Sequence, residues 1–378
     1  SFADVYGNGA AAMIISNSDP IPQHWAYDFI QGNKPYLLNA SDNQLGLQTS
    51  IEYRASTHYY LEDKAKGIDW LTRLPFPVQV VASSRQVDSL SGTVQQQSYA
   101  YRHGYFDPVY REFRGFGYVE RRDAEALTFN SQPYDLPPLV TQSWYHTGVY
   151  ELDSYYLQLS EEFYQGDTQS YLMPESEFVF RAQAPLASDW SAAHRTLKGQ
   201  LLHREVYAPS APVASAQAAA GELADAPYTV SSYRYKVTQL QLAKKGSGGI
   251  YKSHQLESVD YNYERNPSDP VLRQRLVLAV DAYGQMLRAS EIAYPRRSAK
   301  PNTVPAQLSL KTSCQIQQYV PLSDIEGTAY LPSLVQQQQA YSIDGLALAP
   351  SQLVLSWAEV DAAISAACPD GVDVYFDN

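Results

Sequence analysis

The chain has 378 residues, with 28 Lys and Arg against 40 Asp and Glu, which gives a formal net charge of −12. This acidic balance excludes a broad nucleic-acid-binding surface, because binding to phosphates needs a basic patch. No apolar run is long enough to span a bilayer, so direct membrane insertion is not expected. The 31 tyrosines suit strands and half-buried surfaces, so the composition favours a β-dominated chain.

Residues 1–16, SFADVYGNGAAAMIIS, have neither the basic start nor the cleavage site of a secretory signal peptide. They resemble one strand–loop–strand unit of a repeat whose loop carboxylates converge on calcium. Asp4 and Asn8 keep two ligand positions of this degenerate loop, but two others carry residues that cannot bind calcium, so no metal is expected. One propeller blade cannot fold alone. We therefore interpret residues 1–34 as the remnant of a last β-propeller blade and its linker, in a fragment of a longer protein.

The next segments alternate between apolar and polar residues. Residues 45–53 alternate with a period of two, which predicts a half-buried strand. Pro75 and Pro77 bracket Phe76 and exclude a helix there. The strand that follows, at residues 78–82, is expected at the edge of the sheet, where proline is tolerated.

Residues 101–123, YRHGYFDPVYREFRGFGYVERRD, crowd Tyr, Phe, Arg, Glu and Gly into one window. Asp107 and Pro108 are typical of the start of a turn. The pattern predicts two strands joined around this turn, with aromatic rings on one face and Arg and Glu on the other.

The middle of the chain mixes helical and irregular patterns. Residues 150–164 have mostly helical spacing, and residues 191–199 predict a short helix stopped by glycine, followed by a strand at residues 200–207. Residues 209–227 are rich in Ala, Ser and Pro and lack large apolar groups, so they predict an exposed loop or insertion.

The second half predicts a meander of strands, at residues 233–238, 256–263, 272–280 and 286–294. Asp281 and Gly284 occupy the first and last positions of a type I turn, which joins the last two strands into a hairpin. A short helix is expected within residues 353–367, where Ser356 and Glu359 fit a capping box. Cys314 and Cys368 could form a disulfide or remain as two thiols.

No strong catalytic motif is present. The seven histidines have no metal-ligand spacing, and there is no nucleophile elbow or phosphate loop. His103 is more typical of a sheet residue than of a general base, and the glutamates at 161, 162, 175 and 177 are more typical of a solvated face than of a carboxylate pair. The sequence therefore predicts no enzyme, catalytic residue or cofactor. A hydrolase assembled from distant residues would instead show a deep pocket with converging carboxylates of shifted pKa.

Two stretches, WLTRLPFPVQVV at residues 70–81 and GYFDPVYREFRGFGYVE at residues 104–120, resemble signature segments of a known family. That family is the B component of the bacterial tripartite (Tc) insecticidal toxin complexes, of the SpvB/TcdB type, in the region beside its β-propeller. Further segments match in the same order, at residues 34–43, 59–63, 276–297 and 330–366. The resemblance marks as structural signature positions Arg73, Pro75, Phe76, Pro77, Tyr105, Asp107, Glu112, Phe113, Arg114, Gly115, Phe116, Gly117, Asp281 and Gly284.

The resemblance implies a mainly β fold, with a large curved antiparallel sheet of hairpins, related to Rhs and YD-repeat proteins, and a few short helices. Residues 35–378 would be a β-rich shell or strut domain. In the family this sheet and a YD-repeat C component enclose a cytotoxic effector, and the propeller docks on a pore-forming A component. The implied role is non-enzymatic, in a secreted toxin complex, because the toxic activity belongs to the C component.

One further alternative is a cell-surface binding module, such as an adhesin or a carbohydrate-binding sheet. It predicts tyrosines or tryptophans exposed together in a shallow groove, because aromatic rings provide flat contact surfaces with polar tips.

Overall fold

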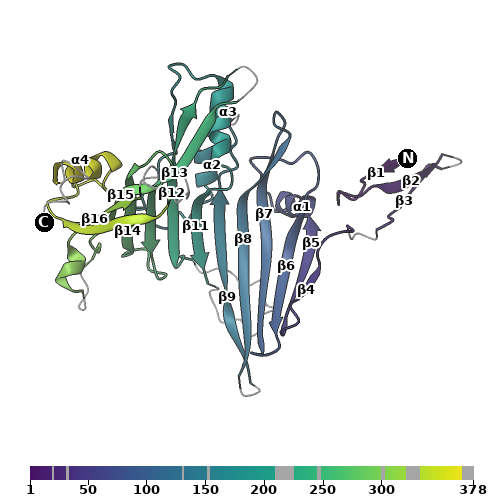
Figure 1. Cartoon of the computed structure of the whole chain (residues 1–378). Helices are drawn as coiled ribbons and strands as arrows, with labels where there is room; N and C mark the ends of the chain where they lie inside the picture. Colours follow the sequence, from purple (N-terminus) through teal and green to yellow (C-terminus); the bar gives the residue numbers. More distant parts are fainter. Residues whose placement is uncertain are drawn as a thin grey trace. The chain divides into compact units, whose positions relative to one another are not determined.

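The computed structural model describes residues 1–18, 21–30, 34–129, 132–150, 154–208, 225–244, 248–298, 303–320 and 333–367. Clustering of the backbone separates two compact units. Unit 1 contains residues 1–161, 198–200 and 206–224, and unit 2 contains residues 162–197, 201–205 and 225–378. Strands dominate both units (Figure 1).

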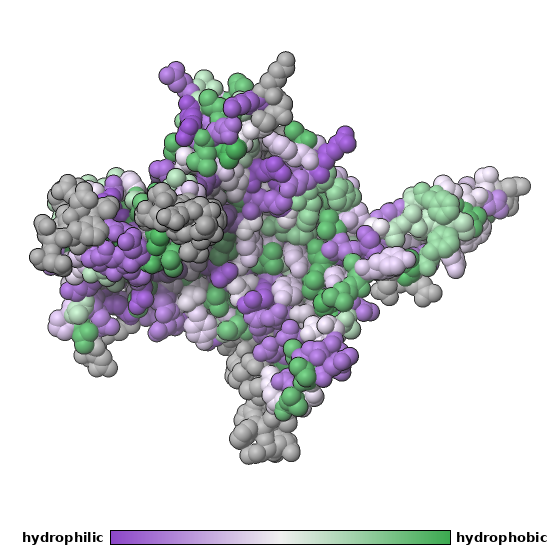
Figure 2. Space-filling model, viewed as in Figure 1, coloured by the Kyte–Doolittle hydropathy of each residue, from purple (hydrophilic) through white to green (hydrophobic). Residues whose placement is uncertain are grey.

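Unit 1 begins with a small antiparallel sheet in the order β1-β2-β3, formed by β1 (Phe2–Ala3), β2 (Ala12–Asn17) and β3 (Gln23–Tyr27). Every residue of β3 is exposed. Figure 2 shows hydrophobic residues on the surface of this small sheet, which carries exposed Phe2, Trp25 and Tyr27. The ring of Phe2 stacks near that of Phe29, with centroids 6.4 Å apart. The strand–loop–strand pattern predicted for residues 1–16 is therefore present.

The larger sheet of unit 1 consists of consecutive antiparallel strands, which are β4 (Ala40–Asp42), β5 (Leu47–Ala55), β6 (Gln79–Asp88), β7 (Thr93–Asp107), β8 (Glu112–Phe129) and β9 (Gln132–Tyr145). Helix α1 (Ser56–Ala65) follows β5 directly, and its Tyr59 packs with Trp70 and Val80. The period of two in β5 holds, since Thr49, Ile51 and Tyr53 are half-buried while their neighbours are exposed.

Two expectations for unit 1 are corrected. Strand β6 is not an edge strand, because it pairs with β5 on one side and β7 on the other. Pro75 and Pro77 precede its first residue and so remove no ladder hydrogen bond. In the described part of residues 150–164, the predicted helix is α2 (Tyr155–Ser160), which ends four residues earlier than expected. It begins just after Ser154, whose backbone is left-handed with φ 61°.

Unit 2 contains most of the second run of strands, and only the last two residues of β11 belong to unit 1. These strands are β10 (Glu177–Val179), β11 (Leu201–Tyr207), β12 (Thr229–Gln241), β13 (Ile250–Asn262), β14 (Val271–Val280), β15 (Met286–Ala293), β16 (Lys311–Tyr319) and β17 (Val335–Ile343). From β12 to β17 each strand pairs antiparallel with the next. Strand β10 runs parallel to β12. The predicted meander is confirmed. β12 and β13 begin four and six residues before the predicted strands, and the ends of β14 and β15 lie within one residue of those predicted.

Short helices cover parts of unit 2. Helix α3 (Ala187–Thr196) begins four residues before the predicted helix, because the side chain of Asp189 accepts a hydrogen bond from the Leu186 amide and caps its start. Helix α4 (Trp357–Ala367) buries Val360 and Ile364 against the sheet, as expected. A one-turn helix, η1, spans Pro305–Leu308.

The predicted fold class is confirmed, since the described residues form antiparallel hairpins with a few short helices. No described helix is long and apolar enough to cross a membrane. Most of the predicted loop at residues 209–227, and Cys368 with its possible disulfide, lie outside the described residues. Cys314 is buried, with 0% of its surface exposed.

Candidate functional site

The β7–β8 hairpin is organised around one buried ion pair. Nη2 of Arg114 donates to Oδ2 of Asp107, and Nη1 donates to the Gly148 carbonyl at 2.6 Å. Arg114 is only 2% exposed and Asp107 only 3%. Oδ1 of Asp107 also accepts hydrogen bonds from the backbone amides of Val109 and Tyr110, at 2.8 and 2.9 Å. The same carboxylate therefore shapes the turn and neutralises the guanidinium behind it.

Other signature residues surround this ion pair. The guanidinium of Arg114 lies 5.7 Å from the ring centroid of Tyr105 and 5.6 Å from that of Tyr110, within cation–π range. Glu112 accepts from Nζ of Lys198 at 2.8 Å and lies 3.7 Å from Nε of Arg114. The signature therefore forms a compact electrostatic cluster that stabilises the hairpin.

Glycines allow close packing on the same hairpin. A Cβ atom at Gly117 would lie 2.7 Å from Oη of Tyr155 and 3.0 Å from Cβ of His103. A Cβ atom at Gly104 would lie 2.7 Å from the side chain of Leu74. Gly115 instead has open space around it but adopts φ +91°, which disfavours any other residue. These positions therefore require glycine for two different physical reasons.

The Arg73-to-Pro77 block contacts this hairpin through Leu74, whose side chain lies beside Gly104, and through Phe76. The ring of Phe76 meets that of Phe106 edge-on, with centroids 5.0 Å apart. Just upstream, the Leu71 amide donates to Nδ1 of His103 at 3.0 Å. Arg73 and Pro75 are exposed. Phe76 is itself 43% exposed, and Leu74 and Pro77 are half-buried, so no residue of the block is fully buried.

The sheet interpretation of His103 fits its surroundings. Its side chain is fully buried, and its backbone adopts φ 56° beside the irregular pairing of Gly104. Glu177, one of the possible paired carboxylates, instead forms ion pairs with Arg234 and Lys236. In the part of the chain that the structure describes, no three His, Cys, Asp or Glu residues are placed to hold a metal.

The degenerate loop in the first 16 residues uses its polar side chains for its own backbone. The carboxylate of Asp4 accepts from the amides of Asn8 and Gly9 at 3.0 and 2.8 Å. Oδ1 of Asn8 accepts from the Ala10 amide at 3.0 Å. These contacts hold the loop between β1 and β2.

The Asp281–Gly284 turn in unit 2 has the predicted geometry. The Gly284 amide donates to the Asp281 carbonyl at 3.1 Å, and Gly284 adopts φ +90°. Oδ1 of Asp281 accepts from the amides of Tyr283 and Gln285, each at 2.8 Å. The aspartate therefore closes the turn with its side chain as well as its backbone.

Sequence reasoning missed a buried clasp in unit 2. Arg297 donates through both terminal nitrogens to the carboxylate of Asp167, each at 2.9 Å, and Tyr263 donates to the same carboxylate at 2.8 Å. Next to it, Arg296 donates to Asp269 at 2.8 Å. Burial alone would raise the pKa of Asp167, but the hydrogen bonds from Arg297 and Tyr263 outweigh it and lower the pKa. The only feature of the sequence that points to this clasp is the adjacent pair Arg296 and Arg297.

A second buried network connects the sheet to the segment before α4. Nε2 of Gln274 donates to Glu257 at 2.6 Å and to the Leu355 carbonyl at 2.9 Å. The Leu355 amide donates to Oη of Tyr294 at 2.8 Å. Burial raises the pKa of Glu257, although hydrogen bonding from Gln274 and the charge of Arg234 act in the opposite direction. Glu257 lies in packed protein, where Arg234 donates to it at 3.2 Å and also pairs with Glu177.

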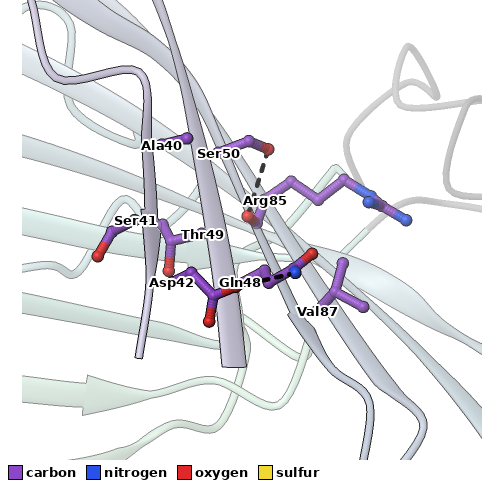
Figure 3. Close-up of a pocket in the computed structure, with 8 residues that line it drawn as sticks. All are labelled: Ala40, Ser41, Asp42, Gln48, Thr49, Ser50, Arg85 and Val87. Carbon is purple, nitrogen blue, oxygen red and sulfur yellow. Dashed lines mark hydrogen bonds between the residues drawn. The ribbon is translucent and has the colours of Figure 1, made fainter. Parts of the chain in front are cut away.

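An open groove of about 520 Å³ lies over β4, β5 and β6 in unit 1, and it is lined by Ala40, Ser41, Asp42, Gln48, Thr49, Ser50, Arg85 and Val87. Nε2 of Gln48 donates to Asp42 at 3.2 Å, while the guanidinium of Arg85 extends away from that carboxylate (Figure 3). This lining has one carboxylate and no aromatic ring. The groove therefore has neither the paired acids of a hydrolase nor the stacking platform of a carbohydrate-binding sheet.

Comparison with family models identifies two consecutive regions. Residues 1–148 match the model of the insecticide toxin TcdB middle/N-terminal region, and residues 192–329 match that of the TcdB middle/C-terminal region. The chain belongs to the TcdB family of insecticide toxins. A comparison with curated proteins found no match.

Solved structures of the same family match across both units. A TcdB2–TccC3 crystal structure without its hypervariable C-terminal region is 29% identical, with a TM-score of 0.73. The Photorhabdus luminescens Tc holotoxin pore and a TcdB2–TccC3–Cdc42 crystal structure are each 30% identical, with TM-scores of 0.72. Each match covers 90% of this chain and 16% of the related chain. The chain therefore spans about one sixth of these relatives.

Proposed function

We propose that this chain is a non-enzymatic part of a Tc toxin B component. Residues 35–378 form part of the wall of a shell that encloses a cytotoxic effector, and residues 1–34 join that wall to the end of the propeller. Its partners are the YD-repeat C component with its effector and, through the propeller, the pore-forming A component. The assembled complex acts outside the producing cell.

The observation that carries this proposal is the match of both units to TcdB2–TccC3 structures over 90% of the chain. The site geometry supports it, because the signature residues stabilise turns and hairpins and surround no reaction centre. Asp107, Arg114, Gly117 and Asp281 each have a contact that shapes the sheet. A wall needs stable strand connections of this kind, whereas an enzyme needs a pocket with converging reactive groups.

The test is a chimera in which this chain replaces the matching segment of TcdB2 in the TcdB2–TccC3 complex. We expect electron microscopy to show a closed particle, and we expect added protease to digest the TccC3 effector no faster than in the unmodified TcdB2–TccC3 complex measured beside it. An open particle, or an effector digested at the rate of the free polypeptide, would contradict the proposal. Glycan binding by the 378-residue chain would favour the cell-surface module instead.

A further inference from the structure

Helix α4 is held on the sheet of unit 2 by polar contacts as well as by its apolar side chains. Nε1 of Trp357 donates to the Val277 carbonyl at 2.9 Å, and Nη2 of Arg288 donates to Asp361 at 2.7 Å. Nζ of Lys236 lies 5.8 Å from the centroid of the Trp357 ring, within cation–π range. The first residue of α4 therefore contacts a lysine of β12.

One histidine lies between two lysines on this face of the sheet. His254 is directly opposite Lys236 in the ladder of β12 and β13. Lys252 lies two positions before His254 on the same strand, so it shares the same face. Nζ of Lys252 donates to the carbonyls of Asp281 and Ala282 at 2.9 and 3.1 Å, which holds this ammonium in place.

The carboxylates around His254 are already paired with other cations. Glu177 of β10 forms an ion pair with Arg234 and lies 3.8 Å from Nζ of Lys236. Glu257 lies 3.2 Å from Arg234, and Asp361 of α4 has its own ion pair with a residue of β15. A further positive charge on this face would therefore add repulsion that these carboxylates do not balance.

The surroundings of His254 favour its neutral form. Nδ1 of His254 is buried and has no hydrogen-bond partner among the described residues, whereas a protonated imidazole donates from both nitrogens. Burial, followed by the charges of Lys252 and Lys236, lowers the pKa of His254 below its ordinary value of 6.5, and Glu177 acts in the opposite direction. The stability that this contributes is fully present above pH 6.5 and is lost as the pH falls through the lower folded-state pKa.

We propose that His254 is an acid-sensitive switch for the docking of α4. When its imidazole gains a proton, repulsion displaces Lys236 from the ring of Trp357, and α4 loosens from the sheet. The apolar cluster that α4 shares with the sheet, which includes Cys314, then opens to solvent. All these residues belong to unit 2, so the inference concerns contacts within this chain and does not depend on the proposed function.

The test measures the reactivity of Cys314, which is 0% exposed in the cluster that also contains Val360 and Ile364 of α4. Cys368→Ser leaves it as the single thiol of the 378-residue chain. The probe is 4,4′-dithiodipyridine, which reacts with thiols in acid as well as at neutral pH. Each rate is divided by that of the chain in concentrated urea at the same pH, because thiol reactivity itself depends on pH. We expect this ratio to be about tenfold higher near pH 5 than near pH 7.5, the scale on which one proton-linked group shifts an equilibrium.

Two variants test the cause of the response. His254→Gln keeps a polar side chain that cannot gain a proton, so its ratio should be the same at both pH values. Lys236→Met removes the facing charge, so the acid response should become smaller. The matched control is His194→Gln, which removes a half-buried imidazole from α3. Helix α3 packs with Tyr235 and Val237, which alternate with Lys236 and so lie on the other face of β12, and this control should keep the full response.

Amide exchange separates loosening of α4 from unfolding of the whole unit. Near pH 5 we expect residues 357–367 to lose protection while residues 311–319 of β16, which carry Cys314, keep it. Equal loss of protection in both segments would contradict the proposal. So would an acid response that persists in His254→Gln, an unaltered response in Lys236→Met, or a ratio in the parent chain that does not change with pH.

Discussion

The buried pair of Asp107 and Arg114 makes the sharpest prediction for single residues. Arg114→Met removes the cation and leaves the Asp107 carboxylate buried without its partner. Removing one member of a buried ion pair costs about 3–5 kcal/mol. We expect a loss of this size in the free energy of unfolding, measured by urea denaturation.

The control lies on the same strand. Arg121 and Asp123 form an ion pair at 2.9 Å, but the side chain of Arg121 is 47% exposed. Exposed pairs of this kind contribute about 0–1 kcal/mol, so Arg121→Met should change the stability little. Equal losses in the free energy of unfolding from Arg114→Met and Arg121→Met would show that the buried Asp107–Arg114 pair stabilises the protein no more than an exposed pair does.

Gly117 tests the packing requirement of the signature. In Gly117→Ala the added Cβ would crowd Oη of Tyr155 and Cβ of His103. Overpacking of this kind costs about 1–3 kcal/mol, and thermal unfolding of the purified variant measures it. Gly248→Ala is the control, because its added Cβ meets no atom within 4 Å. An unchanged thermal unfolding midpoint in Gly117→Ala would mean that the neighbouring side chains can move to accommodate the added methyl group.

At the scale of an element, the start of helix α4 depends on a capping box. The Glu359 amide donates to the hydroxyl of Ser356 at 3.3 Å, and the Ser356 amide donates to the Glu359 carboxylate at 2.8 Å. Hydrogen bonds from the side chain and backbone of Ser356 lower the pKa of Glu359 below its ordinary value of 4.5. We expect Ser356→Ala to destabilise the protein by about 1 kcal/mol at pH 7.

The sign of the pH dependence follows from the lowered pKa. The stabilising charge of Glu359 is fully present above pH 4.5 and is lost as the pH falls through the lower folded-state pKa. The difference in stability between the parent chain and Ser356→Ala should therefore become smaller as the pH falls. Differential scanning calorimetry at a series of pH values measures it. Ser351→Ala is the control. A stability difference that stays constant down to pH 3 would show that the Glu359 carboxylate does not cause it.

Elements with local signals could be predicted from the sequence. The turns at Asp107 and Asp281 carry side chains that bond to amides a few residues away, so the residue types alone indicate them. The capping box and the period of two in β5 are equally local. In these segments local preference and tertiary packing agree.

Features set by partners far along the chain could not be predicted. Asp167 and Arg297 are 130 positions apart, and nothing near either residue indicates the other. The interior position of β6 depends on its pairing with β7, which the two prolines before it do not reveal. In each case the deciding contact is absent from the local sequence.

At the scale of the whole molecule, the two compact units make the last prediction. Each contains a buried ion pair of its own, Asp107–Arg114 in unit 1 and Asp167–Arg297 in unit 2. Compact units with separate cores can unfold as separate cooperative transitions. We therefore expect calorimetry of the parent chain to resolve two transitions.

Variants then assign each transition to a unit. Arg114→Met should lower the midpoint of one transition, because it leaves the buried Asp107 carboxylate without its cation. Asp167→Asn should lower the midpoint of the other, because it removes the buried carboxylate that pairs with the half-buried Arg297 in the same unit. The Arg121→Met chain should leave both midpoints in place. If both destabilising variants shifted a single common transition by similar amounts, the two units would unfold together as one cooperative unit.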